Sequence, residues 1–135
     1  MRKVFVDTQY FVALLNRNDQ WRQTALKAQK EISDARLVTT EVILIEVLNF
    51  LCKQGPMLRS RVVRFVRHVL EDADFKVIFQ AKPMFLNGVE LYESPLDKGY
   101  SLTDCILMNV CKELGIREVL TGDKHFQQEG FEILL

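Results

Sequence analysis

Four acidic side chains stand beside the predicted ends of strands or in the first turns of predicted helices: Asp7, Glu46, Asp104 and Asp123. Brought together, four carboxylates repel one another and raise each other's pKa unless a cation neutralises them. A hard divalent ion with oxygen ligands, Mg²⁺ or Mn²⁺ rather than zinc, suits such a set. Next to a phosphodiester, a site of this kind is suited to polarising a phosphoryl oxygen and activating water.

Each carboxylate also has a structural explanation when it is taken alone. Asp7 and Asp123 can act as caps or turn residues, and Asp104 suits the positive end of a helix dipole. Glu46 can belong to a solvated stripe of its helix. Four independent structural roles need not all fall on one edge of a sheet, so the joint pattern favours a shared site.

Polar neighbours of these acids are candidate supporting residues. Thr8 and Thr103 each adjoin a key aspartate and can hydrogen-bond a carboxylate, although helix capping explains them equally well. Asn49 shares one polar stripe with Glu46 on an otherwise apolar helix. His125, close to Asp123, can touch a substrate, but its distance in sequence from the second histidine gives no zinc motif.

The elements that must position these residues follow from hydrophobic periodicity and turn signals. Strands are predicted at residues 3–6, 37–38, 75–79, 118–120 and 131–134. Helices are predicted at residues 9–15, 41–53, 57–70 and 83–93, with two more that begin at a cap, one at Asp19 and one at Ser101 or Thr103. Alternating strands and helices predict an α/β fold: a three-layer α/β/α domain over residues 1–135, with a mainly parallel central sheet of about five strands.

Local signals refine these elements. Thr8 and Thr40 are expected to cap the helices that follow them, and Gly115 is expected to end its helix in a left-handed conformation. In the helix after Asp19, an inner stripe is predicted for Trp21, Ala25, Ala28 and Ile32.

The helix predicted at residues 57–70 has one apolar and one basic face. Arg61, Arg64 and Arg67 lie on the basic face together with His68. A charged helix face is usually only solvated, so contact with RNA phosphates or with a partner protein is the second interpretation.

Composition excludes several classes of protein. The sequence has 18 basic and 18 acidic residues, so a strongly basic nucleic-acid coat is excluded. Three cysteines, Cys52, Cys105 and Cys111, contain no C-x-x-C pair, which argues against a disulfide framework and for a reducing, cytoplasmic setting. The apolar run at the start is interrupted by Asp7 and Gln9, so neither a signal peptide nor a membrane segment is expected.

The motifs VFVDT, DKGYSLTDC and TGDKHF, with Thr40 and Glu46 between them, resemble the PIN-domain ribonucleases, in particular the VapC-type toxins of toxin–antitoxin pairs. The resemblance implies a parallel sheet between helices and a cluster of Asp7, Glu46 and Asp104 that anchors Mg²⁺ or Mn²⁺, with Asp123 completing the site directly or through water. It also implies hydrolysis of single-stranded RNA and a homodimer inhibited by a small antitoxin protein.

Alternative functions make different demands on the same residues. A solitary PIN-domain nuclease would have the same site but no antitoxin. A phosphatase of the haloacid-dehalogenase type also begins with a strand and an Asp, but requires a second Asp two residues later, where this chain has Gln9. A non-catalytic module that binds RNA or protein gives no reason for four carboxylates at the strand ends.

Overall fold

A five-stranded sheet runs through the middle of the computed structural model, which describes residues 1–94 and 98–135. Its order is β3-β2-β1-β4-β5, and all four strand pairings are parallel. The strands are β1 (Lys3–Val6), β2 (Arg36–Thr40), β3 (Phe75–Ile78), β4 (Glu118–Leu120) and β5 (Glu132–Ile133). The predicted helix break at Pro95 and the first residue of the DKGYSLTDC motif lie outside the described residues.

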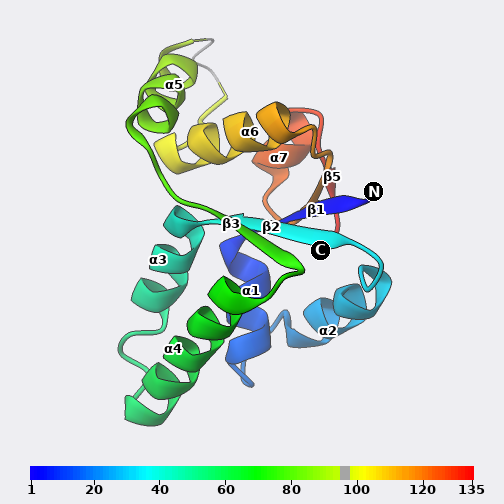
Figure 1. The fold of residues 1–135 in the computed structure, drawn as a ribbon, viewed down its shortest axis with the longest axis vertical. Coiled ribbons are helices and arrows are strands. Elements are labelled where there is room, and N and C mark those ends of the chain that lie inside the picture. Colours follow the sequence, from blue (N-terminus) through cyan, green and yellow to red (C-terminus); the bar gives the residue numbers. More distant parts are fainter. Residues whose placement is uncertain (95–97) are drawn as a thin grey trace.

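Helices cover both faces of this sheet. They are α1 (Thr8–Leu15), α2 (Arg22–Glu31), α3 (Glu41–Phe50), α4 (Pro56–Glu71), α5 (Lys82–Glu93), α6 (Leu102–Leu114) and α7 (Lys124–Gln128). In Figure 1, α5, α6 and α7 lie on one side of the sheet and α1 to α4 lie on the other. The three-layer α/β/α architecture predicted from the sequence is therefore confirmed. Within the described residues, no helix is both long and apolar enough to cross a membrane.

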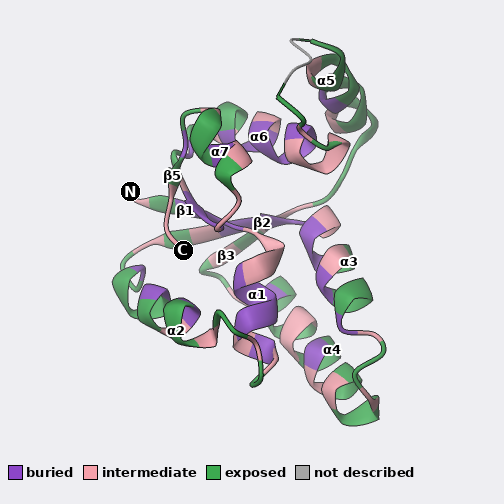
Figure 2. Cartoon of the chain, turned by 180° about the vertical axis from the view of Figure 1, so that it is seen from behind, coloured by how far each residue is buried: buried purple, intermediate pink, exposed green. Residues whose placement is uncertain are grey.

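The centre of the fold is β1 and the helix that follows it. Val4, Phe5 and Val6 are all fully buried, as expected for a central parallel strand covered on both faces. Five of the eight residues of α1 are buried as well, and Figure 2 shows this helix in purple after a pink first turn. Asp7, which joins these two elements, therefore has its backbone fixed by the most buried part of the molecule.

Several predicted local details are wrong. Asp7, not Thr8, caps α1, because its side chain accepts a hydrogen bond from the Thr8 N–H. The second helix begins at Arg22, later than the cap predicted at Asp19, and Trp21 precedes it with 43% of its surface exposed instead of joining the inner stripe.

Other boundaries move by a few residues. The helix predicted at 41–53 ends at Phe50, although Thr40 caps it as expected. Strand β2 runs from Arg36 to Thr40, because Thr39 and Thr40 also pair with β3. The buried Thr39 hydroxyl is satisfied by donating to the Val6 carbonyl at 3.0 Å.

Helix α6, which carries Asp104, is fixed at both ends and along one side. Ser101 and Asp104 form a capping box at its start, and Gly115 ends it with φ at +68°. Its side packs against α5, where Gly88 is buried and lets the two helices approach closely. A Cβ atom at Gly88 would overlap the side chain of Ile106 on α6.

This contact predicts the effect of adding one methyl group at Gly88. Gly88→Ala gains helix propensity of about 1 kcal/mol, but we expect overpacking against Ile106 to oppose it by about 1–3 kcal/mol. The net result should be a lower free energy of unfolding, measured by urea denaturation. Glu90→Ala, on the exposed side of the same helix, is the matched control. A Gly88→Ala protein more stable than the parent would contradict this account of the α5–α6 contact.

Candidate functional site

Strands β1 and β4 lie side by side at the point where the order of the sheet reverses direction along the chain. In open parallel sheets, ligands bind outside the carboxyl ends of the strands at this switch point. Asp7 follows β1 here, and Thr121 follows β4. The Thr121 hydroxyl donates to Asp7 Oδ2 at 2.7 Å, so one hydrogen bond joins the ends of the two strands.

The chain after β4 is tied back toward α1. The Thr121 hydroxyl accepts the Asp123 N–H at 3.0 Å, and Asp123 Oδ1 accepts the His125 N–H at 2.9 Å, which makes Asp123 the cap of α7. Gln9 Oε1 accepts the Gly122 N–H at 2.9 Å. A Cβ atom at Gly122 would lie only 3.0 Å from Gln9 Oε1, so the small residue permits this contact. Gln9 thus holds the loop, in the place where the phosphatase alternative requires an Asp.

The other two acids reach the same region from helices. Glu46, in the middle of α3, accepts a hydrogen bond of 3.3 Å from the Thr8 hydroxyl. Asp104, in the first turn of α6, accepts the Ser101 N–H at 3.2 Å through Oδ2. Both carboxylates are partly buried.

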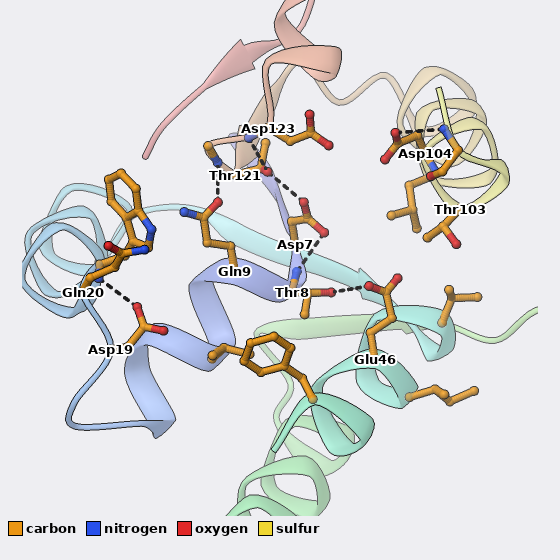
Figure 3. A pocket seen from close by; sticks show the side chains of 18 residues that line it. Asp7, Thr8, Gln9, Asp19, Gln20, Glu46, Thr103, Asp104, Thr121 and Asp123 are labelled. Carbon is orange, nitrogen blue, oxygen red and sulfur yellow. Dashed lines mark hydrogen bonds between the residues drawn. The ribbon is translucent and has the colours of Figure 1, made fainter. Parts of the chain in front are cut away.

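The four predicted acids surround one pocket of about 770 Å³, drawn in Figure 3. The view shows Asp7 near the centre, and the side chains of Glu46, Asp104 and Asp123 extend toward the pocket from three other parts of the chain. Thr8 and Thr103 line the pocket as well. The four acids therefore lie at one pocket, as the shared-site hypothesis predicts, and their chemical roles stay a prediction.

Two groups of predicted residues lie elsewhere. Asn49 is exposed and is not among the residues that line the pocket, so the polar stripe it shares with Glu46 leads away from the site. Arg64 and Arg67 are exposed, as predicted, but Arg61 is partly buried and donates to the Leu15 carbonyl at the end of α1. The expectation of one exposed face formed by all three arginines is wrong, because Arg61 satisfies a helix C-terminus.

His125 is the residue whose place in the site the sequence underestimated. Its Nδ1 lies 3.0 Å from Asp104 Oδ2 and 3.5 Å from Asp123 Oδ1. A carboxylate has no proton to give, so Nδ1–H donates to Asp104 when that acid is ionised. The available signal was local: if Asp123 caps a helix, the side chain two residues later lies beside that cap.

Burial raises the pKa of both Asp7 and Glu46 above the ordinary values of these acids. Neighbouring carboxylates raise them further: Asp123 and Asp104 act on Asp7, and Asp7 acts on Glu46. Hydrogen bonds from threonine and backbone donors offset only part of this rise. Ionisation of Asp7 and Glu46 is therefore less favourable in the folded protein than in water.

The donor set fits a hard divalent cation. Among the described residues that line the pocket, five carry carboxylates and none is Lys or Arg, so no side chain in the wall supplies the missing positive charge. Asp104, Asp123 and His125 each offer one ligand atom within 4.8 Å of the other two, whereas Asp7 and Glu46 line the same pocket outside this group. Oxygen-rich sites of this charge are suited to Mg²⁺ or Mn²⁺.

Comparison with known proteins identifies the family. Residues 4–132 match the PIN domain family, which is nearly the whole chain. The chain belongs to the PIN-domain family.

Individual relatives agree with this assignment. A VapC ribonuclease of Aquifex aeolicus (strain VF5) is 25% identical over 129 residues, covering 94% of this chain and 92% of the relative. Among solved structures, Mycobacterium tuberculosis VapC20, described as a Sarcin-Ricin loop cleaving toxin, has a TM-score of 0.82 at 22% identity and covers 95% of both chains. FitAcB from Neisseria gonorrhoeae has a TM-score of 0.70 at 11% identity, covering 98% of this chain and 96% of that one. At these identities, the two structures show a shared PIN fold.

The raised pKa of Glu46 predicts how the metal-free protein responds to one substitution. An acid whose pKa is higher in the folded state destabilises the fold as pH rises through its unfolded pKa. Glu46→Gln should therefore raise the melting temperature in chelator at neutral pH, and the gain should vanish below the ordinary glutamate pKa of 4.5.

Thermal unfolding from pH 3 to pH 8 measures this effect, with Glu90→Gln on exposed α5 as the control. Mg²⁺ should stabilise the wild type more than the Glu46→Gln protein, since binding to the native state adds stability. An unchanged or lower melting temperature for Glu46→Gln at neutral pH would show that this carboxylate is not under electrostatic strain.

Proposed function

We propose that this PIN-domain protein is a Mg²⁺- or Mn²⁺-dependent endoribonuclease that hydrolyses phosphodiester bonds of single-stranded RNA. The single observation that carries the proposal is the convergence of Asp7, Glu46, Asp104 and Asp123 on one pocket at the switch point of the sheet. Structural roles alone do not require that convergence, because caps satisfy backbone groups wherever a helix begins. The name of the Aquifex aeolicus relative, a VapC ribonuclease, supports the same activity.

In this proposal, Asp7, Glu46 and Asp104 hold the cation and Asp123 completes the site directly or through water. When bound, the ion supplies positive charge that polarises a phosphoryl oxygen and promotes ionisation of the attacking water. The chain's own residues keep the carboxylates in place: Thr121 orients Asp7, Thr8 orients Glu46, and His125 orients Asp104. Such preorganisation matters because a ligand that is already oriented need not reorganise during the reaction.

We propose further that the protein acts in the cytoplasm as the toxin of a pair, inhibited by a small antitoxin. The VapC names of its relatives support this role, and Cys52, Cys105 and Cys111 are all free, as is usual in a reducing compartment. A solitary nuclease shares the site, so the neighbouring gene distinguishes the two. A short adjacent reading frame that encodes a DNA-binding fold favours the toxin.

A homodimer is also proposed, on the surface of α5. Phe85, Leu86, Val89 and Tyr92 are all exposed and follow helical spacing on α5. Four large apolar side chains in one stripe are typical of a surface that is covered by another protein.

The nuclease proposal predicts that activity depends on Asp104 and on a divalent ion. Asp104→Asn keeps the shape of the side chain but removes its charge. Cleavage of a single-stranded RNA should therefore fall at least ~100-fold, which exceeds the loss typical for a residue that only supports a metal ligand. A chelator should abolish wild-type cleavage, and Mg²⁺ or Mn²⁺ should restore it. Gel analysis of cleaved RNA, with circular dichroism as a folding control, measures both effects.

A phosphomonoester is assayed in parallel, with Asp7→Asn as a further variant. RNA cleavage that survives chelation, or survives Asp104→Asn in a contaminant-checked preparation, would disprove the metal-dependent nuclease. Turnover of the monoester alone, with a phosphoryl group on Asp7, would identify the phosphatase instead.

The dimer proposal predicts a change of mass for one substitution. Light scattering at high micromolar concentration should give twice the chain mass for the wild type and a monomer for Val89→Glu, because a charge would then be buried in the contact. Val63→Glu is a matched control, since Val63 on α4 is 37% exposed and Val89 is 38% exposed. A monomeric mass for the wild-type protein would contradict the homodimer proposal.

A further inference from the structure

The pocket has a second wall that the proposed hydrolysis does not use. Beside the carboxylates, it is lined by Trp21 and Phe50, with aliphatic side chains behind them. Trp21 is 43% exposed and Phe50 is 65% exposed, so neither side chain is part of the buried hydrophobic core. Large aromatic side chains that are open to solvent inside a site offer their faces to a ligand.

The turn that carries Trp21 is held in place by hydrogen bonds of its backbone and of the next residue. The Trp21 N–H donates to Asp19 Oδ1 at 2.8 Å, and the neighbouring Arg22 donates to the Leu14 carbonyl at 2.7 Å, which ties this turn to the end of α1. Figure 3 shows Asp19 and Gln20, the residues before Trp21, on the side of the pocket across from Asp104. The Trp21 turn is thus closed by one hydrogen bond and joined to α1 by the other.

Phe50 is tied to the carboxylates by helix geometry. It follows Glu46 by four residues on α3, and side chains at this spacing are neighbours on one face of a helix. A substrate group that rests on Phe50 is therefore about one helical turn from a carboxylate. A phosphodiester at the carboxylates necessarily brings its flanking nucleotides to the adjacent walls of the pocket.

Charge limits how those nucleotides are held. The described lining residues include five carboxylates and no Lys or Arg, so the pocket wall has no cation for the phosphates of the backbone. The carboxylates repel the RNA phosphates, but a contact with an uncharged base avoids this repulsion. Every base has a face that stacks on an aromatic ring.

We propose that Trp21 and Phe50 form a nucleobase-stacking subsite that holds an unpaired base beside the phosphodiester at the carboxylates. The subsite rests on the proposed nuclease function and adds a physical reason for the preference for single strands. Bases within a duplex are already stacked on their neighbours, whereas unpaired bases can turn their faces to aromatic side chains.

The chain offers a direct probe, because Trp21 is its only tryptophan. Intrinsic fluorescence therefore reports on this one side chain. An Asp104→Asn protein, used to prevent cleavage, is titrated in Mg²⁺ with a single-stranded RNA hexamer and with an abasic hexamer that has the same sugar-phosphate backbone. We expect saturable quenching by the intact hexamer and little change with the abasic one.

Substitutions in the same Asp104→Asn protein measure the strength of the subsite. Trp21→Ala and Phe50→Ala should each weaken binding of the intact hexamer by roughly 5- to 100-fold, as expected for the loss of one stacked base, while Trp21→Phe should retain most of the affinity. Binding of the abasic hexamer should not change. Phe79→Ala is the matched control, since Phe79 is 58% exposed, which is similar to the 65% exposure of Phe50, and does not line the pocket.

Equal fluorescence changes with intact and abasic hexamers, no saturable quenching, or intact-hexamer affinities within twofold of the parent for both alanine variants would overturn the subsite. Urea unfolding confirms that each variant is folded. In the cleaving enzyme, Trp21→Ala should raise KM and leave kcat nearly unchanged, as for a contact made equally before and during the reaction.

Failure of the subsite and failure of the nuclease give different results. Chelator-sensitive RNA cleavage with an unaltered KM for Trp21→Ala would leave the nuclease intact and reject the stacking subsite. Wild-type protein that does not cleave RNA would reject the proposed function, and the fluorescence titration would still decide whether Trp21 contacts bases. Quenching by a basic apolar peptide but by neither hexamer would assign the aromatic wall to a protein partner and overturn the proposal.

Discussion

The carboxylates at this site repel one another, and hydrogen-bond donors fixed in the fold hold them close together despite this repulsion. The Thr121 hydroxyl restrains Asp7, the Thr8 hydroxyl restrains Glu46, and His125 together with the Ser101 N–H restrains Asp104. These donors hold the acids together, but the pKa values of Asp7 and Glu46 remain raised. A site that stays short of positive charge loses stability in the apoprotein and is suited to bind a cation, as expected where function and stability compete.

Three of the four acids have structural roles in helix caps, and the same three side chains line the shared pocket. Asp7 caps α1, Asp123 caps α7, and Asp104 belongs to the capping box of α6. A cap is fixed by backbone N–H groups, and it lies at the positive end of a helix dipole, which favours its charged form. Capping therefore orients these three carboxylates where the ends of parallel strands meet the starts of helices, and the pocket lies at this place.

The two walls of the pocket differ in the chemistry of their side chains. The carboxylate wall is suited to a cation and the phosphate it neutralises, whereas the wall that contains Trp21 and Phe50 presents uncharged aromatic faces. Because no basic side chain lines the described pocket, the affinity of this subsite for a base should depend little on salt, in contrast to binding through Lys and Arg. The exposed Arg64 and Arg67 are on a different helix, outside the pocket lining.

The sequence by itself determined the parts that depend on local pattern. Strand β1, the left-handed Gly115 and the four acids were all found from it, because apolar runs, caps and strand ends leave a signal within a few residues. Only the tertiary structure decided that Trp21 faces the pocket, that Asn49 turns away, that Arg61 reaches the end of α1 and that His125 approaches Asp104. These side chains meet partners far away in sequence, and their positions follow from how helices pack on the sheet, which helical or strand periodicity does not encode.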